Sequence, residues 1–213
     1  MFHLMIKDFR IQRKKSFLVF FLFIYILNFS NTESSVLIFS AITALIAFVM
    51  AVNSNFNGRE GNRAQQSLLL SLPVTRKEVI AAKYFMNGVW FLAAFIPGAG
   101  LLLIKDFSSF QTGRPMFYLN ALILSLCLTY FLMSVYYPVY YRLGYKVAQT
   151  AAELFGAISI GLFFSGLTNF TFLNTYLSAV SEQTVLLPAA AITLVAVFIS
   201  YELSVQFFSS KDF

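Results

Sequence analysis

Charged residues are scarce in this sequence: Asp, Glu, Lys and Arg make up 11% of its 213 positions, whereas 59% are hydrophobic. In a typical soluble domain about a quarter of the residues are charged, and a small domain leaves much of its surface in water. This composition therefore excludes a soluble enzyme. Histidine and cysteine occur once each, as His3 and Cys127. Intramembrane metalloproteases and rhomboid-like Ser–His proteases are excluded because their centres need histidines within the membrane, and a single cysteine excludes an internal disulfide.

Long apolar stretches are what the sequence has instead. A transmembrane helix needs about 20 such residues, with a range of roughly 17–25. Six stretches of about that length predict an all-α integral membrane protein with a single domain over residues 1–213, although five or seven spans remain alternatives. The first stretch lacks a small-residue cleavage pattern, so it is interpreted as a retained signal anchor. The predicted spans cover residues 16–29, 36–52, 84–104, 117–141, 150–167 and 184–207.

The basic residues predict how these spans are oriented. Of 15 Lys and Arg residues, only Lys105 and Arg114 lie in loops predicted on the extracellular side. Cytoplasmic loops carry the excess of Lys and Arg in membrane proteins. Both termini are therefore predicted to be cytoplasmic, in a multi-pass protein of the plasma membrane that binds no nucleic acid.

Residues 1–15 show the 3.6-residue period of an amphipathic helix. His3, Lys7, Arg10 and Lys14 recur on one face, and apolar residues recur on another. Such a helix is expected to lie in the membrane interface, with its cations among anionic headgroups. The alternative is a signal for orientation with no further role.

The predicted cytoplasmic loop, residues 53–83, holds two short helical patterns. Asn62 can cap a helix that continues through a leucine-rich segment to Pro73, where proline ends it. The run Thr75-Arg76-Lys77-Glu78 is a capping box that opens a second helix, predicted to continue through Lys83 into the span at 84–104. A helix, a proline break and a capped helix suit a rigid element that contacts a cytoplasmic partner. An interfacial helix that only rests on lipid is the alternative.

This loop resembles that of the permease subunits of type-2 ABC exporters. The resemblance is carried by Ser71-Leu72-Pro73-Val74-Thr75-Arg76, followed by a helix with the pair Lys83-Tyr84. Small bacterial members, including exporters of phenol-soluble modulins and antimicrobial peptides, are also similar in length, span count and internal termini. The resemblance implies a transport subunit, not an enzyme, that moves an amphipathic or hydrophobic substrate, for which a peptide is the favoured candidate.

The resemblance also implies partners. The helix around 63–72 corresponds to the coupling helix that contacts a separate ATPase. No G-x-x-x-x-G-K-[ST] motif occurs, so this chain is expected to bind no cofactor, with ATP and Mg on two copies of the partner. A second permease copy or a paralogue would complete the transporter within the lipid bilayer. An ATP-independent channel or secondary transporter, or a toxin-immunity membrane protein, remains an alternative. The residues implied in coupling are Arg63, Gln66, Ser67, Leu68, Leu70, Leu72, Pro73 and Arg76.

Three further features lie within the predicted spans. Glu153 and Glu202 are intramembrane carboxylates, with either a structural or a substrate-contacting role. Small residues recur four apart in the fifth span and allow close helix contact, either within one subunit or in a permease dimer. The tyrosine-rich end of the fourth span, residues 136–142, is interpreted as an interfacial aromatic belt, with a substrate entry site as the alternative. The candidates for the dimer contact are Ala152, Gly156 and Gly161.

Overall fold

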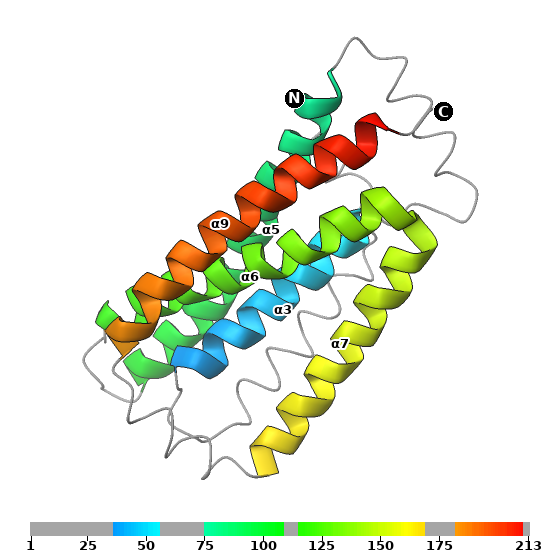
Figure 1. Cartoon of the computed structure of the whole chain (residues 1–213). Coiled ribbons are helices and arrows are strands. Elements are labelled where there is room, and N and C mark those ends of the chain that lie inside the picture. The colour runs from blue at the N-terminus through cyan, green and yellow to red at the C-terminus, as the bar shows by residue number, and fades with distance from the viewer. Residues whose placement is uncertain (1–35, 56–74, 109–114, 169–181, 211–213) are drawn as a thin grey trace.

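The computed structural model describes residues 36–55, 75–108, 115–168 and 182–210, which form five α-helices (Figure 1). The predictions for residues 1–15, for the span at 16–29 and for most of the loop at 53–83 lie outside these residues. The other five predicted spans each fall within a helix. The helices are α3 (Val36–Asn55), α5 (Arg76–Ser108), α6 (Pro115–Leu143), α7 (Tyr145–Thr168) and α9 (Glu182–Ser209).

Length and hydropathy make several of these helices suitable for a membrane. Among the described residues, the segments Lys77–Ile104, Met116–Leu143 and Leu186–Ser209 are long and apolar enough to span one, and Phe39–Ser54 is a shorter apolar helix. Large apolar side chains such as Ile96, Phe198 and Leu194 are exposed on the surface of the bundle. In a chain with so little charge, such a surface fits lipid rather than water.

Helix α6 is the central element of the bundle. It packs against α3, α5, α7 and α9, and α5 also contacts α3 and α9. Figure 1 shows α3, α5, α6 and α9 running side by side, with α7 standing off beside α3 and α6. The bundle has one end, here called the proximal end, at which α5 begins and α6 and α9 finish.

Small hydroxyl residues occupy the contacts between α6 and its neighbours. Ser125 and Thr129 of α6 are fully buried and donate to carbonyl oxygens one turn earlier, at 2.6 and 2.7 Å. Ser40 of α3 donates across to the carbonyl oxygen of Ala121 in α6. Because these hydroxyls are satisfied by backbone oxygens, small residues bring the helix backbones close without burying unpaired polar atoms.

A single residue, Gly144, joins α6 to α7. Its φ of 87° lies in the left-handed region, which glycine enters without steric cost. Its N–H donates to the carbonyl oxygen of Tyr140 at 3.1 Å, which closes the last turn of α6. Helix α7 starts at the next residue, so glycine at this position turns the chain out of α6 and sets the direction of α7.

Candidate functional site

The start of α5 is a capping box, as the sequence predicts. The Thr75 N–H donates to Oε2 of Glu78 at 3.0 Å, and the Glu78 N–H donates to Oγ1 of Thr75 at 3.3 Å. The predicted continuity is confirmed as well, because α5 runs without interruption from Arg76 to Ser108. The segment after Pro73 therefore enters the apolar bundle as one helix, and a displacement of its first turn acts directly on the rest of α5.

Of the residues implied in coupling, only Arg76 is described, as the first residue of α5. The predictions for Arg63, Gln66, Ser67, Leu68, Leu70, Leu72 and Pro73 lie outside the described residues. What the structure does show is how the helix that follows them is held at the proximal end of the bundle.

Three tyrosines hold α5 there, and they are called the tyrosine cluster: Tyr84 of α5, and Tyr130 and Tyr137 of α6. The Tyr137 hydroxyl lies 3.2 Å from the carbonyl oxygen of Lys83 and 3.1 Å from Oδ1 of Asn87. The Tyr130 hydroxyl donates to the carbonyl oxygen of Tyr84 at 3.3 Å. Both α6 tyrosines thus bond to consecutive carbonyl oxygens of α5.

The third member extends the cluster to α9. The hydroxyls of Tyr84 and Ser200 are 2.6 Å apart, and both residues are buried. The Tyr84 ring also packs edge-on against Tyr201 of α9 and lies 4.8 Å from the Tyr137 ring, centroid to centroid. Contacts between residues 46 to 116 positions apart therefore tie three helices together, about two turns after the start of α5.

Asn87 sits beside the cluster and is fully buried. Its Oδ1 accepts from Tyr137, whereas its Nδ2 has no hydrogen-bond partner within the part of the chain that the structure describes. A buried unsatisfied donor costs about 1–3 kcal/mol. The Asn87 amide is therefore paired only through its bond to Tyr137 among the described residues.

The cluster corrects the interpretation of the tyrosine-rich end of α6. An aromatic belt would face the membrane interface, but Tyr136, Tyr137 and Tyr141 are all buried inside the bundle. The sequence carried a signal for this arrangement. Tyr130, Tyr137 and Tyr141 are separated by seven and four residues, which places them on one face of a helix.

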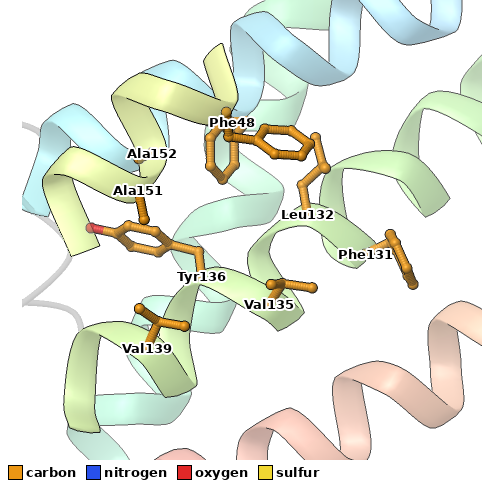
Figure 2. A pocket seen from close by; sticks show the side chains of 9 residues that line it. Phe48, Phe131, Leu132, Val135, Tyr136, Val139, Ala151 and Ala152 are labelled. Atoms are coloured by element: carbon orange, nitrogen blue, oxygen red, sulfur yellow. The ribbon is translucent and has the colours of Figure 1, made fainter. Parts of the chain in front are cut away.

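An apolar pocket of about 200 Å³ lies between α3, α6 and α7 (Figure 2). Figure 2 shows Phe48, Tyr136 and Ala152 converging from these three helices, with Phe131 at the far edge. Of the lining side chains only that of Tyr136 carries a polar atom, so the pocket suits an apolar group. The nine lining residues are Phe48, Phe131, Leu132, Val135, Tyr136, Val139, Ala151, Ala152 and Phe155.

The candidate dimer residues fall in different surroundings. Ala152 is only 8% exposed and lines the pocket, so it packs within the subunit. A Cβ built on Gly156 would have no heavy atom within 4 Å, which leaves this position open for contact with another molecule. Gly161 lies in the second half of α7, where the structure does not describe side-chain surroundings.

Both candidate carboxylates, Glu153 and Glu202, are exposed on faces turned away from the bundle. Glu153 accepts from Nε2 of Gln149, four residues earlier in the same helix, at 2.8 Å. Glu202 is next to Tyr201, whose hydroxyl reaches the carbonyl oxygen of Lys77 near the start of α5. Glu202 thus lies level with the beginning of α5, and neither carboxylate points into the described core.

Nothing in the described residues resembles a reaction centre or a metal site. No group of three or more His, Cys, Asp or Glu side chains there could hold a metal ion. Cys127 is buried in α6, and burial in apolar surroundings disfavours a reactive thiolate. The described residues form a bundle of helices with exposed apolar surfaces.

Comparison with known proteins gives one match. The sequence model of a family described as "ABC-2 family transporter protein" matches residues 3–209. No curated protein and no solved structure matches the chain. The family match covers nearly the whole chain, including all five helices.

Proposed function

Because this chain belongs to the ABC-2 family of transporter proteins, we propose that it is the transmembrane permease subunit of an ABC exporter. The family match carries this proposal, and it makes the chain a membrane transport component that works with a separate ABC ATPase. The capped and continuous α5 supports it further, because a helix that enters the bundle directly from the predicted coupling segment can transmit motion.

The proposed cargo is an amphipathic or hydrophobic molecule, with a peptide as the favoured class. The apolar pocket between α3, α6 and α7 is compatible with such a cargo, because its lining side chains are almost all apolar and can contact an apolar group. We further propose that two ATPase subunits bind ATP and Mg, that two permease copies form the membrane part, and that both termini face the cytoplasm of the plasma membrane.

Co-purification tests the proposed function directly. The full chain is expressed together with an ABC ATPase subunit from the same organism. It is then extracted in mild detergent and reconstituted in liposomes. We expect the ATPase subunit to co-purify and its ATP hydrolysis to rise in the presence of this chain. Absence of any bound ATPase would contradict the proposal and favour an ATP-independent channel, a secondary transporter or an immunity protein.

Two substitutions test the proposed attachment site. Leu68→Glu or Leu70→Glu places a charge on the apolar part of the coupling segment, where it would have to be desolvated against the ATPase. We expect ATPase binding and export to be lost while the permease remains in the membrane. Asn57→Glu is the control, because it adds the same charge to the same loop outside the segment at 62–72. Unchanged binding in both leucine variants would contradict the coupling assignment.

A further inference from the structure

Two hydrogen bonds of the tyrosine cluster go to backbone carbonyl oxygens that already have a partner within α5. Inside a helix, the carbonyl oxygens of Lys83 and Tyr84 already accept from N–H groups four residues later. The bonds from Tyr137 and Tyr130 are therefore additional. They connect α6 to two consecutive carbonyl oxygens along the axis of α5.

The close approach of Tyr130 depends on Gly88. A Cβ at that position would lie 3.2 Å from the Tyr130 hydroxyl, which is tighter than ordinary contact. Glycine thus leaves the space in which the hydroxyl reaches the α5 backbone. In this contact the Tyr130 side chain meets a backbone oxygen of α5 and no second side chain. The position of α5 along its axis is therefore set by its backbone.

These contacts fix the relative height of three helices. A helix rises about 1.5 Å per residue, and a hydrogen bond is lost when its donor and acceptor are more than about 3.5 Å apart. Sliding α5 by one residue against its neighbours would therefore break the bonds to Tyr130, Tyr137 and Ser200 together. Apolar contacts between helices restrict such sliding less sharply, because they have no paired donor and acceptor.

We propose that Tyr84, Tyr130 and Tyr137 are positioning residues that make α5, α6 and α9 move as one body when the segment before α5 is displaced. The proposal rests on the proposed function, since the displacement would come from an ATPase bound to that segment. The cluster lies where α5 enters the bundle, so the motion passes to α6 and α9 at its point of entry. Helix α7, which contributes no residue to the cluster, is free to change its angle to this body.

Double electron–electron resonance measures whether α5 and α9 move relative to each other, and it needs no transport substrate. Spin labels are attached to Lys77→Cys, at the start of α5, and to Leu187→Cys, near the start of α9 at the end of the bundle away from the proximal end. Both substitutions are made in a Cys127→Ala background. Both label sites are exposed. Labelled chains are diluted among unlabelled chains so that only distances within one subunit are recorded. The reconstituted complex with its ATPase is examined without nucleotide and after trapping with ATP, Mg and vanadate.

With the cluster intact, we expect the distance between the labels to be the same in both states. In the double variant Tyr84→Phe/Tyr137→Phe, trapping should shift or broaden it by at least the rise of one residue, ~1.5 Å. ATPase binding should be unchanged, because the rings and their packing remain. Ser200→Ala, which removes only the bond to α9, should give a smaller change of the same kind.

Tyr118→Phe is the matched control, because it makes the same chemical change near the other end of α6. It should leave the distance unchanged in both states. A double variant whose distances equal those of the intact chain in both states would overturn the proposal, as would a distance in the intact chain that changes on trapping. Failure of the intact chain to bind an ATPase would instead contradict the proposed function, and with it the source of the displacement.

Discussion

Helices α5 and α7 both pack against α6, but they are held by different forces. Helix α5 is fixed by hydroxyls that bond to backbone oxygens at set positions. On α7, the hydrogen bonds of Gln149 and Thr150 stay within the helix, and the contact with α6 leaves an apolar pocket. Directional bonds need their donor and acceptor at set positions, so they restrict the register of two helices more sharply than apolar contact does. The bundle therefore has one tightly registered side and one side that can adjust.

The largest effect is expected at a buried ring of α3 that packs against both α5 and α6. Phe39 of α3 is 1% exposed, and its ring contacts Phe95 of α5 and Phe117 of α6. Phe39→Ala should lower the free energy of unfolding by about 3–5 kcal/mol, because it leaves a large cavity among three helices. Thermal unfolding in detergent micelles measures the loss.

Phe155→Ala on α7 is the matched control for this substitution. Phe155 is 43% exposed and lies at the pocket, so its loss enlarges an existing space and should cost much less. Equal losses for the two phenylalanines would show that α7 is packed as firmly as α3, and the contrast between the two sides would then be wrong.

The next effect concerns the junction that gives α7 its direction. Gly144→Ala places a side chain at a φ of 87°, which costs about 1–2 kcal/mol even though a Cβ there meets no neighbour. We expect α7 to pack less firmly, so that a cysteine introduced at buried Ala152 in a Cys127→Ala background reacts faster with a maleimide. Gly100→Ala, at an equally open position inside α5, should not increase this rate. An unchanged rate in the Gly144 variant would show that the junction does not control α7.

A smaller effect is expected at the start of α5. Thr75→Val removes the hydroxyl that caps the helix, at a cost of about 1 kcal/mol. Amide hydrogen exchange in the first turn of α5 should accelerate, while exchange in the turns held by the tyrosine cluster should not. Glu78→Gln is the control, because an amide can retain the reciprocal bond to the Thr75 N–H. Faster exchange along the whole of α5 would show that the cluster does not hold it.

The sequence predicts elements better than it predicts the contacts between them. The capping box at Thr75 and the continuity of α5 follow from local spacing, and both are confirmed. The hydrogen bond between Gln149 and Glu153 is also local, at an interval of four residues. Interactions of this kind depend on a few adjacent residues, so a single sequence contains them.

The tyrosine cluster was missed because its bonds join residues far apart in the chain. Tyr84 and Ser200 are separated by 116 positions, and no local pattern shows that they meet. Tyrosine also suits both an interface and a buried site, since its ring is apolar and its hydroxyl needs one partner. A spacing of seven residues places Tyr130 and Tyr137 on one face of α6, but only the packing of α5 beside α6 supplies their acceptors.

The smallest effect on a single subunit is expected at Gly156, on the side that can adjust. A Cβ there meets nothing within 4 Å, so Gly156→Leu should change the free energy of unfolding of one subunit by less than ~0.5 kcal/mol. Gly98→Leu is the contrasting control, because a Cβ at Gly98 already lies 3.4 Å from the Phe39 ring. If a second permease copy packs on this open face of α7, Gly156→Leu should lower the dimer fraction measured by mass photometry in detergent, whereas Gly98→Leu should lower stability instead. A dimer fraction that Gly156→Leu leaves unchanged would remove Gly156 from the proposed interface, and α7 would then be an adjustable helix that faces lipid.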